Sequence, residues 1–256
     1  MSALEWNGIL RLPQAALAGG RRIPKTVLVR QALLTKAEQK VLNKVGALAH
    51  FATVQKSTTY IPSVVDDAHD IQSVVFLTGQ MAGSSAYSEV AGLLHKSFPN
   101  PTVLLMEGSD DVCVSMSVTR RSLAERGAVV VDHIESTGAI DLALPELAPL
   151  AEELAFERLP QHDLLAYLEG LAWCMRRARM TAALGFYPRC GEGERPQFEA
   201  LVSRREALAS EAAELRRRRT EKDLSLNETA RLRMRLHSVE GELADVDNRI
   251  KELCHA

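Results

Sequence analysis

The sequence predicts an α+β protein: a mixed α/β domain with an antiparallel meander, then a helical segment, then a C-terminal coiled-coil helical hairpin. Short apolar runs typical of strands alternate with amphipathic segments over residues 1–145, and residues 146–190 keep a helical spacing. From Thr229 to residue 254, apolar side chains recur at alternating intervals of four and three, whereas in residues 198–220 leucines recur every seven residues with charged residues between them. That interval buries one stripe of a helix against another helix. We therefore expect three parts with these boundaries.

The composition excludes several classes of protein. The 256 residues are 46% hydrophobic and 25% charged, and the formal net charge is −2, so the chain has no global basic signature. No apolar run approaches the roughly 18 residues that span a bilayer, and the N-terminus lacks the charged-then-apolar pattern of a signal peptide. The four cysteines are far apart and form no C-x-x-C pair, which argues against a disulfide framework or a zinc ribbon. We expect a cytoplasmic protein with no membrane contact.

The N-terminal elements are expected to begin with short helices. One helix opens at residues 12–14 and stops at Gly19-Gly20, and a second begins at residues 23–25, where proline is tolerated. Residues 35–38, Thr-Lys-Ala-Glu, have the spacing of a capping box. They start an amphipathic helix that is expected to run through Val45.

Strand signals follow this helix. Strands are expected over residues 47–54, 70–77, 102–106, 112–118 and 128–134, with Gly79 closing the second of them. Ser84 or Ser85 is expected to cap a helix that ends at the proline-containing residues 98–101. Residues 108–111, Gly-Ser-Asp-Asp, predict a hairpin turn. The result is an antiparallel meander after one helix.

The C-terminal part carries the clearest pattern in the chain. Its predicted buried seam consists of Leu232, Leu236, Val239, Leu243, Val246, Ile250 and Leu253. Residues 189–197 are polar and interrupted by glycine and proline, so we interpret them as a linker. Two helices, over residues 198–220 and 226–254, are expected to fold back as an antiparallel hairpin. One continuous dimerising helix is the alternative, because residues 200–240 contain no glycine or proline.

Several short motifs occur together in a fixed order. They are Leu12-Pro13, Ile23-Pro24-Lys25, the run from Ile71 to Leu77, the passage from Phe98-Pro99-Asn100-Pro101 to Val103-Leu104-Leu105, and Glu221-Lys222…Asn227-Glu228…Leu232. In this order the chain resembles the bacterial domain-of-unknown-function family forty-three ninety-one. The resemblance covers most of residues 12–135 and 198–250, and residues 145–195 match poorly. It implies an accessory protein encoded beside DNA methyltransferases and helicases in restriction-like or phage-defence clusters, and it suggests no catalytic residues.

The catalytic motifs in the sequence are incomplete. Residues 78–85 lie between a strand and a helix, where phosphate loops sit, but they lack the lysine and the glycine spacing of a P-loop. The acidic residues 66–70 are interpreted as a solvated loop, and His133 beside Asp132 as a structural pair. The strand at residues 112–118 has no acid and no lysine, which a restriction-type nuclease core needs to bind Mg²⁺. Cys113 and Cys174 lie on apolar patterns and are expected in the core. We predict no catalytic residue, no metal site and no cofactor.

Arginine is concentrated where the two C-terminal helices are expected to meet their turn. The cluster consists of Arg216, Arg217, Arg218, Arg219, Arg231, Arg233 and Arg235. Arginine suits bidentate contact with phosphate. The cluster could equally be a solvated surface paired with Glu214, Glu221 and Glu228, or a contact for an acidic protein.

Together these features predict a non-catalytic accessory subunit of a phage-defence or restriction-modification-like complex. Its C-terminal helices would dock either a partner protein or a nucleic acid. The protein would be a methyltransferase or helicase of the same system, and the nucleic acid would be DNA. Two alternatives remain open at this point. One is a divergent metal-dependent nuclease whose acids converge only in three dimensions, and the other is a purely structural protein that forms a homo-oligomer through its coiled coil.

Overall fold

The computed structural model describes residues 5–81, 86–125, 127–220 and 225–254. By compactness the chain divides into two units, Met1–Arg179 and Met180–Ala256. The division falls inside the long helix α7, and each unit is described by itself.

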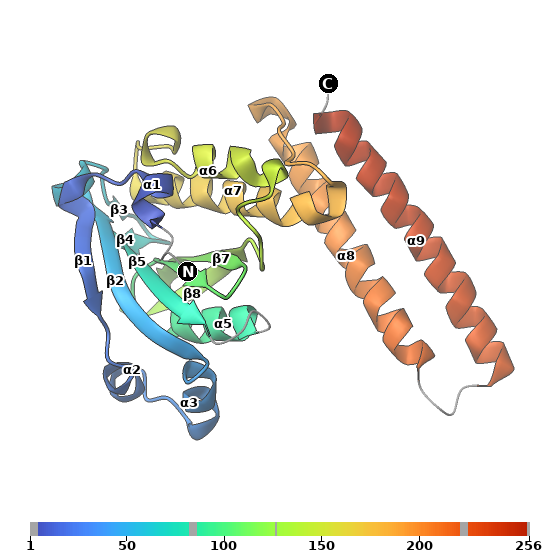
Figure 1. The fold of residues 1–256 in the computed structure, drawn as a ribbon, viewed down its shortest axis with the longest axis horizontal. Helices are drawn as coiled ribbons and strands as arrows, with labels where there is room; N and C mark the ends of the chain where they lie inside the picture. Colours follow the sequence, from blue (N-terminus) through green and yellow to red (C-terminus); the bar gives the residue numbers. More distant parts are fainter. Residues whose placement is uncertain (1–4, 82–85, 126, 221–224, 255–256) are drawn as a thin grey trace. The chain divides into compact units, whose positions relative to one another are not determined.

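The first unit is built on a mixed sheet (Figure 1). Its strands are β1 (Leu17–Arg22), β2 (Val45–Gln55), β5 (Ser73–Met81), β6 (Thr102–Glu107), β7 (Val112–Arg121) and β8 (Val129–Ser136), in the spatial order β1-β2-β5-β6-β7-β8. All neighbours pair antiparallel except β5 and β6, which are parallel. A separate two-stranded ribbon pairs β3 (Val64–Val65) with β4 (Asp70–Ile71). The sheet is therefore mostly antiparallel, with the predicted meander formed by β6, β7 and β8.

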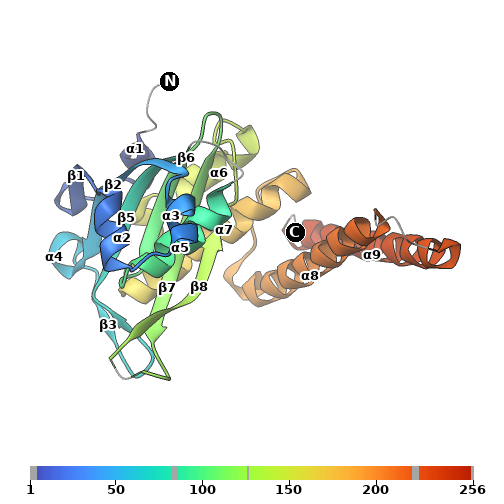
Figure 2. The same cartoon turned by 90° about the horizontal axis from the view of Figure 1, so that it is seen from below.

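Helical segments cover both faces of this sheet. They are α1 (Trp6–Leu10), η1 (Gln14–Ala16), α2 (Lys25–Gln31), α3 (Lys36–Leu42), α4 (Lys56–Thr59), α5 (Tyr87–Ser97), η3 (Pro145–Leu147), α6 (Ala148–Glu153), η4 (Phe156–Arg158) and α7 (Leu164–Leu184). A core cluster joins α2, α3 and α5 to one face, through buried side chains such as Leu42, Leu48, Leu77, Val90 and Leu104. Helices α6 and α7 lie on the other face (Figure 1, Figure 2). The central strands β6 and β7 are thus buried, whereas the edge strands β1 and β8 are largely exposed.

Local sequence signals account for several of these elements. The Thr35 hydroxyl accepts a hydrogen bond from the backbone N–H of Glu38, and the Glu38 carboxylate accepts one from the N–H of Thr35, which confirms the predicted capping box. The backbone N–H of Gly108 bonds to the carbonyl of Asp111, closing the predicted turn between β6 and β7. These bonds form between residues close in sequence, so a local pattern was sufficient to predict them.

Three predicted boundaries are wrong. Gly19 and Gly20 do not end a helix but lie in edge strand β1, at positive φ, where the pairing with β2 shifts register. Helix α3 ends at Leu42, and Val45 instead opens β2, pairing with Met81. Strand β5 continues through Gly79 to Met81, because Gly79 pairs with Leu48 of β2 on one side and with Met106 of β6 on the other. In each case pairing with a distant strand overrode the local signal. The predicted caps Ser84 and Ser85 lie outside the described residues.

The second unit consists mainly of two long helices. Helix α8 spans Arg195–Arg219 and α9 spans Leu226–Cys254, after the short η5 (Glu192–Glu194). Helix α8 begins inside the predicted linker, since its Pro196 is tolerated in the first turn. Ser225 and Glu228 exchange capping-box hydrogen bonds at the start of α9. The two helices lie side by side in both views (Figure 1, Figure 2).

Candidate functional site

Helices α8 and α9 bury apolar stripes against each other. Along α9, Leu232, Leu236, Val239, Val246 and Ile250 are buried, whereas Leu243 and Leu253 are partly exposed. The buried positions of α8 are Phe198, Leu201, Val202, Leu208, Ala212 and Leu215. The two stripes supply the apolar contact that holds an otherwise polar pair of helices together.

Ion pairs between the helices fix an antiparallel register. Arg205 lies 2.7 Å from Asp247, Arg216 lies 2.7 Å from Glu240, and Arg235 lies 2.7 Å from Glu211. The first pair joins an early position of α8 to a late position of α9, and the other two pairs join later positions of α8 to earlier positions of α9, which is the antiparallel arrangement. The pairs of Arg216 and Arg235 are exposed, and such pairs contribute about 0–1 kcal/mol each, so their main effect is on alignment.

The arginine cluster separates into two groups. Arg216, Arg217 and Arg235 form ion pairs with Glu240, Glu214 and Glu211, respectively. The second group, which we call the arginine quartet, consists of Arg218, Arg219, Arg231 and Arg233; all four are exposed and form no ion pair with the described part of the chain. Hydrogen bonds from Ser225, aided by the positive charges of Arg218 and Arg231, lower the pKa of Glu228. The quartet therefore places four positive charges at the end of α8 and in the first turns of α9.

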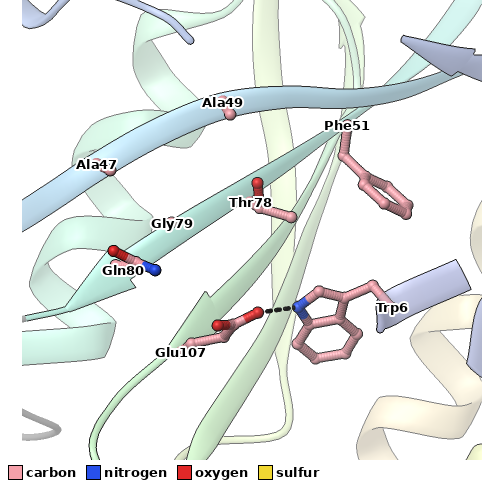
Figure 3. Close-up of a pocket in the computed structure, with 8 residues that line it drawn as sticks. All are labelled: Trp6, Ala47, Ala49, Phe51, Thr78, Gly79, Gln80 and Glu107. Carbon is pink, nitrogen blue, oxygen red and sulfur yellow. Dashed lines mark hydrogen bonds between the residues drawn. The ribbon is translucent and has the colours of Figure 1, made fainter. Parts of the chain in front are cut away.

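The first unit contains a groove between α1 and the sheet (Figure 3). Its volume is about 300 Å³, and it is lined by Trp6, Ala47, Ala49, Phe51, Thr78, Gly79, Gln80 and Glu107. The indole N–H of Trp6 donates a 2.6 Å hydrogen bond to Glu107 Oε1. Figure 3 shows the rings of Trp6 and Phe51 on one side of the groove, the Glu107 carboxylate beside the indole, and the side chain of Gln80 farther away, near the end of β5.

Sequence reasoning missed this groove. Its residues come from α1, β2, β5 and β6, which are far apart in the sequence. The one local signal is the alternation of small residues at Ala47 and Ala49 on β2. Alternate residues of a strand share a face, so a large ligand or side chain could approach there.

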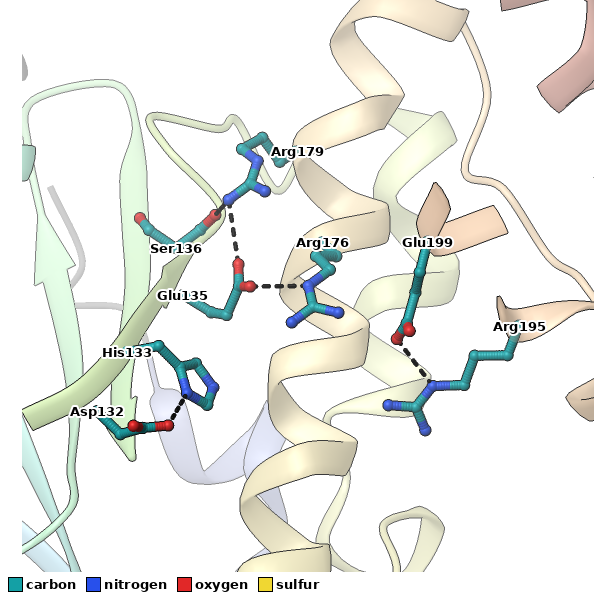
Figure 4. Close-up of polar contacts among 8 residues, drawn as sticks. All are labelled: Asp132, His133, Glu135, Ser136, Arg176, Arg179, Arg195 and Glu199. Atoms are coloured by element: carbon teal, nitrogen blue, oxygen red, sulfur yellow. Dashed lines mark hydrogen bonds and ion pairs between the residues drawn. The ribbon is translucent and has the colours of Figure 1, made fainter. Parts of the chain in front are cut away.

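Charged residues elsewhere in the first unit serve to join elements. Glu135 on β8 is held by Arg176 at 2.7 Å and by Arg179 at 3.2 Å, both on α7, and Arg179 also donates to the carbonyl of Ser136 (Figure 4). The Glu135 side chain is only 12% exposed, so the two guanidinium groups offset the cost of burying its charge.

In the second unit, Figure 4 also shows Arg195 paired with Glu199, one turn later on α8.

Asp132 and His133 form an exposed pair on β8. His133 Nδ1 lies 3.1 Å from Asp132 Oδ2, and this hydrogen bond is the main reason that the pKa of Asp132 is lowered. Both side chains are about two-fifths exposed, at 42% and 40%. Asp132 Oδ1 also accepts a 2.8 Å hydrogen bond from Arg120 Nε on β7, so the carboxylate is held from two sides.

The acidic residues 66–70 form the loop of the ribbon β3–β4. Asp66 Oδ1 accepts hydrogen bonds from the backbone N–H groups of His69 and Ala68, which lower the pKa of this carboxyl. Within the described ranges, no group of three or more His, Cys, Asp or Glu side chains is placed to hold a metal ion. Of the phosphate-loop candidate at residues 78–85, Thr78 to Met81 belong to β5, and the last four residues lie outside the described part.

Both apolar cysteines lie in the core, as predicted. Cys113 is 1% exposed and Cys174 is 3% exposed. Burial raises the pKa of Cys113, and it raises that of Cys174 to about 11. Thiols with raised pKa values are poor nucleophiles at neutral pH.

Among the helices in the described part of the chain, none is both long enough and apolar enough to cross a bilayer. No curated protein and no solved structure matches the sequence. The family model described as "Domain of unknown function (DUF4391)" matches residues 10–243, including the segment 145–195 that matched poorly by motif. The match confirms the family suggested by the ordered motifs, and the chain is a member of the DUF4391 family.

Proposed function

We propose that this protein is a non-catalytic interaction subunit of a bacterial phage-defence or restriction-modification-like complex. In this proposal α8 and α9 act as a coiled-coil helical hairpin that docks a partner. A methyltransferase or helicase of the same system, or the nucleic acid on which such a system acts, would be that partner.

The arginine quartet is the observation that carries the proposal. Four guanidinium groups stay exposed and unpaired with described acids, although other arginines of the same helices are paired across the interface. Phosphates of the nucleic-acid backbone bind such groups through bidentate hydrogen bonds. Of the partners, duplex DNA fits this surface best, and an acidic protein surface is the competing outcome of the test.

A salt titration of DNA binding tests the proposal. Wild-type protein should bind random-sequence duplex DNA without sequence preference, with affinity that falls steeply as salt rises, by a log–log slope of about −0.9 per phosphate neutralised. The quartet variant, with Arg218, Arg219, Arg231 and Arg233 replaced by Gln, should flatten that slope. The slope should fall by about 0.9 for each arginine that contacts a phosphate.

A matched variant controls for total charge. Replacing Arg216, Arg217 and Arg235 by Gln removes arginines that are already paired with Glu240, Glu214 and Glu211. This variant should change the slope less per arginine than the quartet variant. No DNA affinity for wild type at low salt would reject the nucleic-acid form of the proposal, and saturable binding to a methyltransferase or helicase subunit would then favour the protein form.

A further inference from the structure

We propose that the groove between Trp6 and the sheet is a binding site for a guanine base. This inference is independent of the proposed role of the C-terminal helices, because every residue that it uses belongs to the first unit.

The size and floor of the groove suit one planar ring system. A volume of about 300 Å³ lies at the small end of organic-ligand sites, which span roughly 300–1,000 Å³. The floor includes small residues of β2 and β5, namely Ala47, Ala49 and Gly79, and the rings of Trp6 and Phe51 stand on one side. A flat floor with aromatic walls accepts a flat aromatic ligand.

The polar residues of the groove present a specific hydrogen-bonding pattern. Glu107 Oε1 already accepts the indole N–H of Trp6, while Oε2 has no partner among the described residues. The side chains of Thr78 and Gln80 also form no hydrogen bond within the described part of the chain. A carboxylate oxygen accepts only, whereas an amide offers both donors and an acceptor.

Guanine matches this pattern at one edge. Its ring N–H and exocyclic amino group are adjacent donors for Glu107, and its carbonyl oxygen beside them accepts from the amide of Gln80 or the hydroxyl of Thr78. Adenine lacks the ring N–H and the carbonyl on that edge. The carboxylate therefore selects guanine, because the wrong base would leave a charged acceptor without its donors.

The charge of the groove indicates that the base, not a phosphate, is recognised. No lysine or arginine belongs to the lining residues, and Glu107 contributes a negative charge. The groove also opens where the parallel strands β5 and β6 end, since Gln80 and Glu107 are paired near their carboxyl ends. Ligands of α/β sheets commonly bind at such ends.

Calorimetric titration with nucleosides tests the inference on the intact chain. Guanosine should bind with a Kd of about 1 mM or tighter. Inosine, which lacks the exocyclic amino group, should bind more weakly, and adenosine about tenfold more weakly or worse. A single-stranded dA oligonucleotide with one dG, compared with one of dA alone, shows whether the base is also taken from a nucleic-acid strand.

Two variants and one control locate the site. Glu107→Gln keeps an oxygen to accept the Trp6 hydrogen bond but loses the free carboxylate oxygen, so guanosine affinity should fall about tenfold or more. Ala49→Leu fills the floor and should abolish binding. Glu146→Gln changes an exposed glutamate outside the groove and should have no effect.

Equal affinity for guanosine and adenosine would overturn the inference, and so would unchanged guanosine binding in Ala49→Leu. Free arginine also offers adjacent N–H donors to a carboxylate, so tighter binding of arginine than of guanosine would overturn it as well. Absence of binding by both guanosine and the dG oligonucleotide at millimolar concentration would also reject it. Because the comparison of nucleosides uses wild-type protein, it holds even if a variant fails to fold. The quartet variant should bind guanosine normally, so failure of either proposal can be recognised separately.

Discussion

The guanidinium of Arg235 on α9 donates a 2.7 Å hydrogen bond to the carboxylate of Glu211 on α8, 24 residues earlier. This pair aligns the two helices across their shared seam. It also accounts for one of the seven clustered arginines, since the charge of Arg235 is balanced within the unit. The same contact therefore helps to align the two helices and explains why Arg235 does not belong to the exposed quartet.

Crosslinking tests this register. With Cys190 and Cys254 replaced by serine, the pair Glu211→Cys and Arg235→Cys should crosslink within one chain when treated with a short bifunctional reagent. Moving the first cysteine to Ser203, eight residues or about 12 Å along the helix, should reduce the yield sharply. Crosslinks found only in covalent dimers would instead support a continuous helix that pairs between chains.

A carboxylate introduced into the seam should destabilise the second unit more at a buried position than at an exposed one. Val239 is 0% exposed, so Val239→Asp should destabilise the second unit by about 3–5 kcal/mol, because the carboxylate has no partner in the stripe. Leu243→Asp should lower the free energy of unfolding by less than Val239→Asp, since Leu243 is partly exposed. Thermal unfolding followed by circular dichroism at the helix band measures both changes. Ser238→Asp is the control, and an equal effect at Ser238 and Val239 would contradict the seam.

Protonation of buried His95 should lower the free energy of unfolding of the first unit at acid pH. This side chain is fully buried, its Nε2 lies 2.8 Å from Ser115 Oγ, and burial lowers its pKa from 6.5 to about 3. As pH falls below about 6.5, the unfolded chain takes up this proton before the folded chain does. The stabilisation is therefore complete above that pH and is lost between pH 6.5 and 3, by at most about 1.4 kcal/mol per pH unit.

Urea unfolding at several pH values, read by tryptophan fluorescence, measures this effect, because both tryptophans belong to the first unit. His95→Gln should flatten the dependence of unfolding free energy on pH. His162→Gln should leave it unchanged, since that side chain is 73% exposed. An identical slope in wild type and His95→Gln would show that another group is responsible.

Gly170 should not tolerate a side chain. A Cβ there would lie 2.6 Å from Cδ of Pro160 and 3.3 Å from a methyl carbon of Leu159. The proline ring cannot rotate away, so Gly170→Ala should cost about 1–3 kcal/mol through overpacking. Gly92→Ala, in α5 with no atom within 4 Å of the added carbon, should instead be neutral or stabilising by up to about 1 kcal/mol. Denaturant midpoints of the two variants that shift in the same direction would refute this packing argument.

We expect no Mg²⁺-dependent DNA cleavage by the isolated chain. The Asp66 carboxylate is occupied by two backbone N–H groups of its own loop, and Asp111 Oδ1 accepts the hydroxyl of Tyr87. Within the described residues, neither carboxylate belongs to a group of three or more side chains that could hold a metal ion, which this hydrolysis needs to activate water. Cleavage that disappears on Asp66→Asn or Asp111→Asn substitution would contradict this expectation and restore the nuclease alternative.

The sequence by itself determined the features whose stabilising contacts are local. The capping boxes at Thr35 and Ser225, the turn from Gly108 to Asp111, and the apolar stripe through Val239 depend on residues a few positions apart. Such contacts can be predicted from the sequence, because helical periodicity and capping residues involve neighbouring positions only. The order of motifs that indicates the family is a sequence property for the same reason.

Tertiary structure decided the features that depend on distant partners. Gly19 and Gly20 belong to a strand because β2 pairs beside them, and β5 runs through Gly79 because β2 and β6 lie on either side of it. Trp6 meets Glu107 across 101 positions of sequence, so the groove exists only once the sheet has brought its strands together. Strand pairing and side-chain convergence of this kind have no local periodicity, and the physical reason is that their energy comes from contacts which form only when the whole sheet is assembled.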